Sequence, residues 1–125
     1  MKNLFVGLFL VAFTLTTTAQ DKMMKTEVKT VSLEQTKGEF TQKAITLSEG
    51  TYVFEISNNA VGHDVGFVLA PKGKTDAANH IKAAYVTKVV ATGNTESSNE
   101  VTLDKGEYVY FCPMNPTPEY TLIVK

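Results

Sequence analysis

The chain has 125 residues, 43% of them hydrophobic, and a formal net charge of −1. A chain of this length forms one domain, and its balanced charge offers no basic surface for nucleic acid, so a nucleic-acid partner is not expected. The single cysteine, Cys112, excludes a fold held together by internal disulfides.

The N-terminal segment has the pattern of an export signal. Lys2 precedes an apolar run over 4–15, which is shorter than the about 20 residues that a membrane-spanning helix needs. Small residues then lead up to Ala19. The pattern predicts a signal peptide over residues 1–19 and a mature domain over residues 20–125, located in a periplasm or outside the cell and free of the membrane. An uncleaved membrane anchor is the alternative.

The mature chain is predicted to form short strands separated by turns. Tyr52, Phe54 and Ile56 occupy alternate positions, which places three large apolar side chains on one face of a strand. Residues 107–111 are apolar on both faces, which predicts a central strand. The full set of predicted strands covers 28–33, 40–47, 51–57, 65–69, 85–90, 100–103, 107–111 and 120–124.

One segment between these strands is expected to be helical. Thr75 or Asp76 can cap a short helix that is predicted over 75–84. Turn signals such as Glu49-Gly50 and Lys105-Gly106 separate the strands. About eight strands with this punctuation predict an all-β protein, a Greek-key β-sandwich with one short helix.

Two residues of the kind that bind soft metals stand at predicted strand ends. His63 precedes an apolar strand, and Cys112 follows the strand 107–111 and precedes the proline-rich stretch 113–118. Imidazole and thiolate ligands that converge from separate strands, with a weak thioether, are typical of copper sites. An unpaired thiol in an exported protein is otherwise a liability, unless it is buried or pairs with another chain.

These features, in their order along the chain, resemble the cupredoxin family of blue-copper proteins, and azurin and amicyanin in particular. The resemblance implies a secreted single-electron carrier in which His63 and Cys112 bind copper. It also implies that residues 63–85 form an azurin-like insertion, with His80 on a helix at the side of the barrel, away from the ligands. The similarity starts near residue 40 and rests on Tyr52-Val53-Phe54-Glu55-Ile56 with Asn58-Asn59, Gly62-His63-Asp64-Val65, the strand 95–103 with Lys105-Gly106-Glu107-Tyr108, Tyr110-Phe111-Cys112 and the closing segment 120–125.

The loop after Cys112 departs from the family pattern. The shortest family loop has the form Cys-x-x-His-x-x-Met, but here Asn115 stands at the second-histidine position and Pro118 at the methionine position. No histidine follows Cys112. Met114 is a candidate replacement, because a thioether is a ligand that Cu(I) favours. Asn115 could supply a side-chain oxygen, or could brace the loop through a hydrogen bond to the thiolate or to the Asn58-Asn59 pair.

The predicted metal ligands are therefore His63, Cys112 and Met114, for one copper ion. The expected function is electron transfer or Cu(I) handling, with a redox protein or a copper-delivery protein as the partner. No enzymatic activity is expected, because no glycine or helix terminus beside Cys112 could form an oxyanion hole. The alternative is a metal-free module of the same fold, in which the proline-rich loop, Tyr120 and the Phe67 region form a protein-contact surface.

Overall fold

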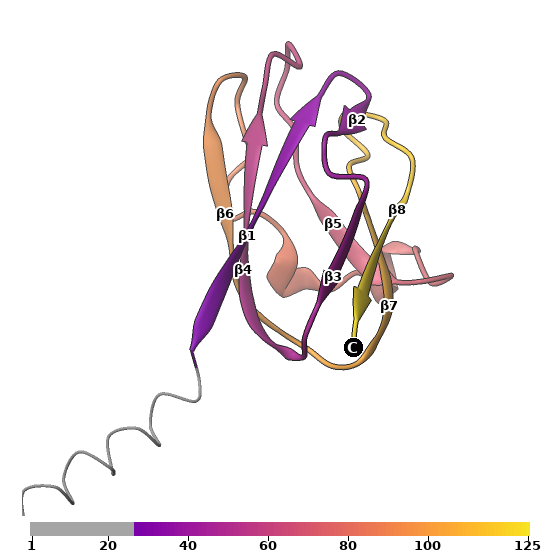
Figure 1. The fold of residues 1–125 in the computed structure, drawn as a ribbon. Helices are drawn as coiled ribbons and strands as arrows, with labels where there is room; N and C mark the ends of the chain where they lie inside the picture. The colour runs from indigo at the N-terminus through magenta and orange to yellow at the C-terminus, as the bar shows by residue number, and fades with distance from the viewer. Residues whose placement is uncertain (1–26) are drawn as a thin grey trace, which may run out of the picture.

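The computed structural model describes residues 27–125, which form two four-stranded sheets packed face to face (Figure 1). The first sheet has the order β2-β1-β4-β6. Its two central strands, β1 (Val28–Thr36) and β4 (Gly50–Asn58), run parallel to each other. At the edges, β2 (Glu39–Phe40) pairs with β1 and β6 (Thr95–Leu103) pairs with β4, both antiparallel.

The second sheet has the order β3-β8-β7-β5. In it, β7 (Gly106–Phe111) lies between β8 (Tyr120–Val124) and β5 (Val68–Pro71) and is antiparallel to both. The edge strand β3 (Ala44–Leu47) runs parallel to β8. The two sheets confirm the predicted all-β sandwich, and the place of β7 confirms the central strand predicted over 107–111.

The predicted export signal is not part of this sandwich. Residues 1–19 and the cleavage site after Ala19 lie outside the described residues. Within residues 27–125, no helix is long and apolar enough to cross a bilayer.

The alternating pattern along β4 builds the core between the sheets. Tyr52, Phe54 and Ile56 are at most 4% exposed, as their alternate positions predict. Phe54 stacks on Phe67, the residue before β5, with ring centroids 5.3 Å apart. Burial of each such side chain stabilises the fold by about 1.5–3 kcal/mol. The packed interior gives the loops at the ends of the sandwich a firm support.

The continuous strand predicted over 40–47 is wrong. The chain leaves the first sheet after Phe40 and enters the second sheet as β3. The Thr41 N–H still donates to the Glu34 carbonyl at 2.9 Å in the register of β1 and β2, and the chain leaves β1 only beyond this bond. Alternating apolar residues indicate that one face of a segment is buried between the sheets. They do not indicate with which sheet the backbone of that segment forms hydrogen bonds.

The strand predicted over 85–90 is also wrong. Val86 makes an isolated bridge to β6, and Val90 makes another to Val65. Because these bridges go to different parts of the fold, no continuous ladder forms between them. Val65, which was expected to begin the strand 65–69, makes only this bridge, and regular pairing starts with β5.

Two 3₁₀ turns, η2 (Ala77–Asn79) and η3 (Lys82–Ala84), replace the helix predicted over 75–84. Asp76 lies at the N-cap of η2 without a side-chain capping bond. The Ile81 N–H donates to a carbonyl of β5 at 2.8 Å. It is therefore not available for the bond one turn back that an α-helix requires.

Candidate metal centre

The two central strands of the first sheet each carry a buried side-chain amide where they end, at the upper end of the sandwich in Figure 1. Gln35 continues the inward-facing positions of Val31 and Leu33, and Asn58 stands opposite Gln35 in the parallel register. Gln35 is fully buried and Asn58 is 2% exposed. A buried amide is costly unless it is hydrogen-bonded, so its partners show what this part of the fold holds in place. We call this part, where β1, β4 and β7 finish, the ligand end.

Asn58 holds the turn that carries His63. Its Nδ2 donates to the carbonyls of His63 and Val90 at 2.8 and 3.0 Å, and its Oδ1 accepts the Val61 N–H at 3.1 Å. The His63 ring is exposed, with Nδ1 3.0 Å from the Asp64 carbonyl. Because a carbonyl only accepts, Nδ1 carries a proton, and in the neutral ring Nε2 keeps its lone pair.

Cys112 follows β7 and is a fully buried, free thiol. Its sulfur accepts the Gly66 N–H at an N–S distance of 3.4 Å. The Cys112 N–H donates to Thr117 Oγ1 at 3.0 Å, and the Thr117 N–H returns to the Cys112 carbonyl at 3.4 Å. The ligand end therefore presents a sheltered sulfur at the start of a short loop that is closed by its own hydrogen bonds.

Met114 lies on the outer side of Gly66. It is 46% exposed, and a Cβ built on Gly66 would lie 3.4 Å from the Met114 sulfur. The two residues line a groove of about 360 Å³, together with Phe67, His80 and Pro113. Gly66 thus has the buried Cys112 sulfur on one side and the Met114 thioether on the other.

The structure corrects the position expected for His80. The ring is half-buried beside the loop after Cys112 and packs edge-on against Phe111, with centroids 5.9 Å apart. Its Nε2 donates to the Thr75 carbonyl at 2.9 Å, and in the neutral ring its Nδ1 accepts the Tyr85 hydroxyl at 2.8 Å. The two 3₁₀ turns bring these partners to opposite sides of the ring, and both nitrogens are engaged within the fold.

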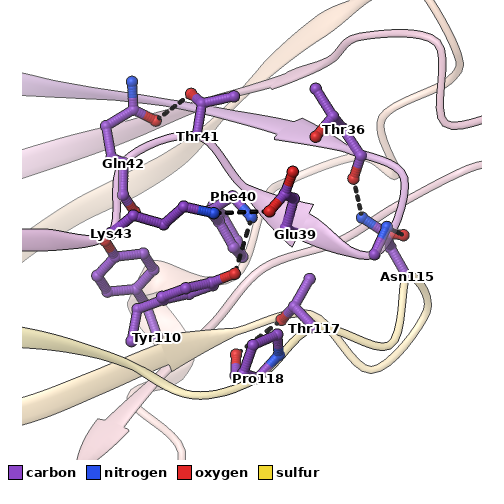
Figure 2. Close-up of polar contacts among 12 residues, drawn as sticks. Thr36, Glu39, Phe40, Thr41, Gln42, Lys43, Tyr110, Asn115, Thr117 and Pro118 are labelled. Atoms are coloured by element: carbon purple, nitrogen blue, oxygen red, sulfur yellow. Dashed lines mark hydrogen bonds and ion pairs between the residues drawn. The ribbon is translucent and has the colours of Figure 1, made fainter.

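Asn115 braces the loop, with partners other than those predicted. It is 2% exposed, its Nδ2 donates to Gln35 Oε1 at 3.0 Å and to the Thr36 carbonyl at 2.9 Å, and its Oδ1 accepts the Gly38 N–H at 2.7 Å. Figure 2 shows the Asn115 amide directed at Thr36. The bonds that the sequence suggested to the thiolate or to Asn58-Asn59 are not formed, because the side chain bonds instead to the end of β1 and to Gly38 in the turn after it.

Sequence reasoning misses Gln35. Its side chain donates to the Gly66 carbonyl at 2.7 Å and accepts from Asn115, so it contacts both segments that adjoin Cys112. The available signal was a polar residue two positions after Leu33, on the inward face of a strand. The predicted strand ended at Leu33, whereas β1 continues through Gln35.

The three predicted ligands differ in their surroundings: the His63 ring is exposed, the Cys112 thiol is fully buried and the Met114 thioether lies at the groove. Among residues 27–125, no three His, Cys, Asp or Glu side chains group together as a metal cluster. One imidazole from His63 and one thiol from Cys112 stand on neighbouring loops, and Met114 adds a thioether at the groove. Sulfur ligands select Cu(I), so this donor set suits Cu(I) better than Cu(II).

The chain is similar to known copper proteins in sequence and in fold. The family described as copper binding proteins, plastocyanin/azurin family, matches residues 16–122. Among curated proteins, no individual sequence matches the chain. Among solved structures, the fold is similar to auracyanin B, with a TM-score of 0.63 and 20% identity, covering 78% of this chain and 88% of auracyanin B.

Two further auracyanins have a similar fold. Auracyanin A of Chloroflexus aurantiacus, described as a "blue" copper protein, has a TM-score of 0.61 and 20% identity, covering 78% of this chain and 99% of that one. The dithionite-reduced auracyanin of Roseiflexus castenholzii has a TM-score of 0.60 and 17% identity, covering 77% of this chain and 96% of that one. At these identities the likeness shows a shared fold.

Proposed function

The chain belongs to the plastocyanin/azurin family of copper-binding proteins, and we propose that it binds one copper ion through Cys112 and His63, with Met114 assisting. The observation that carries the proposal is the buried Cys112 sulfur, which accepts the N–H of Gly66, three residues after His63. This hydrogen bond joins the loop of the thiol to the segment of the imidazole. Copper bound there would supply either a one-electron redox couple or a Cu(I) cargo.

The donor set supports Cu(I) handling as the first candidate function. Asn115, at the position of the family's second histidine, is engaged with Gln35, Thr36 and Gly38. One imidazole with thiolate and thioether sulfur matches the preference of Cu(I). We therefore propose that the protein holds Cu(I) and exchanges it with a copper-delivery protein.

Electron transfer to a redox protein is the second candidate, because family membership favours it. In both cases the protein acts as a carrier and not as an enzyme. The signal-peptide pattern over residues 1–19 supports export to a periplasm or to the exterior, with residues 20–125 as the active form.

The test is a Cu(I) titration of the exported protein against a chromophoric Cu(I) chelator. The protein is expected to take up one equivalent. The Cys112→Ser and His63→Ala variants should each weaken binding by at least about 100-fold, because a lost ligand costs more than a lost supporting residue. His80→Gln is the matched control and should leave binding unchanged, because both nitrogens of His80 are engaged within the fold.

The other outcomes separate the remaining functions. A strong visible thiolate-to-Cu(II) band would select electron transfer over Cu(I) handling. No competition with the chelator, together with no protection of Cys112 by Cu(I), would refute both copper functions and favour the metal-free contact module. Mass spectrometry should find Gln20 as the first residue, and a retained Met1 would contradict the proposed signal peptide.

A further inference from the structure

The backbone of one residue connects the Cys112 sulfur to strand β1. The Gly66 N–H donates to the sulfur at 3.4 Å, and the Gly66 carbonyl accepts from Gln35 Nε2 at 2.7 Å. The peptide groups on either side of Gly66 are planar and rigid. The Gln35 bond holds the peptide group that follows Gly66 and the sulfur accepts from the group that precedes it, so Gln35 limits the freedom of Gly66 beside the sulfur.

Asn115 holds Gln35 from the other side. The Asn115 nitrogen faces two oxygens, of Gln35 and Thr36, and its oxygen faces the Gly38 N–H, so the orientation of the amide has one solution. The Gln35 amide then has its oxygen toward Asn115 and its nitrogen toward Gly66. Donors run from Asn115 to Gln35 and from Gln35 to Gly66, so the first bond polarises the Gln35 amide that makes the second.

An apolar residue would fill the position of Gln35 at lower cost. Val31 and Leu33 occupy the two preceding inward positions of β1. Burial of a primary amide is unfavourable unless it is hydrogen-bonded. Both partners of the Gln35 side chain adjoin the thiol. Gly66 bonds to the sulfur, and Asn115 stands three residues after Cys112 in the same loop.

We propose that Gln35 and Asn115 are positioning residues for the Cys112 sulfur. They direct the Gly66 N–H at the sulfur and hold the loop 113–118 closed beside it, with or without a metal. The surroundings of the sulfur are then set before copper binds. The proposal deepens the proposed function, and only its copper readout rests on that function.

The test compares Gln35→Met with Ser98→Ala in the metal-free protein. Methionine keeps the length of glutamine and removes both hydrogen bonds of the side-chain amide. Ser98 is a buried polar residue of β6, and its hydroxyl accepts the Phe54 N–H at 2.9 Å. Its loss therefore weakens the fold and leaves the hydrogen bonds of Asn115, Gln35 and Gly66 in place. The measurements are the Gly66 amide proton shift and exchange rate, and the rate at which Cys112 reacts with a neutral disulfide reagent.

Gln35→Met should shift the Gly66 signal and speed the Cys112 reaction about tenfold, the factor that corresponds to one lost hydrogen bond. Ser98→Ala should leave the Gly66 signal in place. Rates compared at denaturant concentrations that give both variants equal stability remove the effect of global unfolding. Equal changes in the two variants would overturn the proposal, because they would make Gln35 a structural residue only.

Asn115→Asp provides a second variant if Gln35→Met does not fold. It keeps the size of asparagine and turns both donors into acceptors that face the oxygens of Gln35 and Thr36. The same shift and faster reaction are expected, and an unchanged Gly66 signal would contradict the proposal. Cu(I) affinity should fall about tenfold in Gln35→Met. Failure of the unsubstituted protein to bind Cu(I) would refute the proposed function, while the amide and thiol measurements would still decide the positioning role.

Discussion

The two ends of the sandwich are closed by different kinds of contact. Opposite the ligand end, each turn carries a local tyrosine bond: the Tyr52 hydroxyl donates to the Ser48 carbonyl at 2.7 Å and the Tyr108 hydroxyl to the Asp104 carbonyl at 2.8 Å, each four positions back. One longer-range bond, from the Lys105 N–H to Glu49, joins the two turns. At the ligand end, the side chain of Asn115 bonds to groups 77 to 80 positions away.

The difference separates turns held mainly by their own tyrosines from a loop that adds three long-range bonds to its local ones. A local turn orders few residues when it closes, whereas a long-range contact forms only after distant strands have come together. The bonds of Asn115 therefore form only while β1 and β7 are both in place. Substitutions at the two ends should differ accordingly.

The largest effect is expected at Asn115. Replacement by leucine of similar size removes three hydrogen bonds and leaves Gln35 Oε1 and the Gly38 N–H without a partner. We expect Asn115→Leu to lower the free energy of unfolding by about 3 kcal/mol. Urea denaturation of the metal-free protein measures it, and a loss below about 1 kcal/mol would show that long-range closure contributes little.

A second, smaller effect is expected at alkaline pH. The Tyr110 hydroxyl donates to the Gln42 carbonyl, 68 positions away, and burial, with a contribution from Tyr120, raises the pKa of Tyr110 from 10.0 to about 12. Because the pKa is higher in the folded state, this stabilisation is complete below pH about 10 and is lost as the pH rises toward 12. The loss should amount to about 2 kcal/mol.

Tyr110→Phe isolates this contribution. The variant should be less stable than the unsubstituted protein at neutral pH, and its stability should fall less steeply between pH 10 and 12. Urea denaturation at a series of pH values gives both curves. Two curves of equal slope would mean that another group controls alkaline unfolding.

The smallest effect is expected at the locally closed end. Tyr52→Phe keeps the buried ring and removes one bond to the Ser48 carbonyl, so stability should fall by about 1 kcal/mol. The reaction rate of Cys112, measured under native conditions, should stay within about twofold of its original value. A larger change in that rate would show that the two ends of the sandwich are coupled.

The strands that the sequence predicts correctly are those in which one face packs on the core along the whole length. The side chains of β4 alternate between buried and partly exposed, and the pattern shows this directly. The segment 40–47 alternates as well, but its backbone changes sheets after Phe40. In the segment 85–90, Val86 and Val90 make bridges to separate parts of the fold. In both segments apolar side chains mark residues that contact the core. The backbone partners are distant in sequence, so the side-chain pattern does not identify them.

The candidate site divides in the same way. His63 and Cys112 stand out in the sequence because imidazole and thiol are distinctive donors, and their role in copper binding is a proposal. The function of Asn115 as a brace depends on partners in β1 and the turn after it, and sequence neighbours do not reveal such partners. Gln35 is missed for a related reason, since an amide at the end of a strand is usually exposed.

Gly66 lines the groove and also contacts the buried thiol. Its φ is not in the left-handed region, so the backbone does not require glycine there, and the Met114 sulfur is the neighbour that a Cβ would meet. The N–H of the same residue faces the Cys112 sulfur, so Gly66 adjoins both sulfurs of the candidate site. A side chain added at this one position would contact the Met114 thioether and crowd the groove beside the thiol.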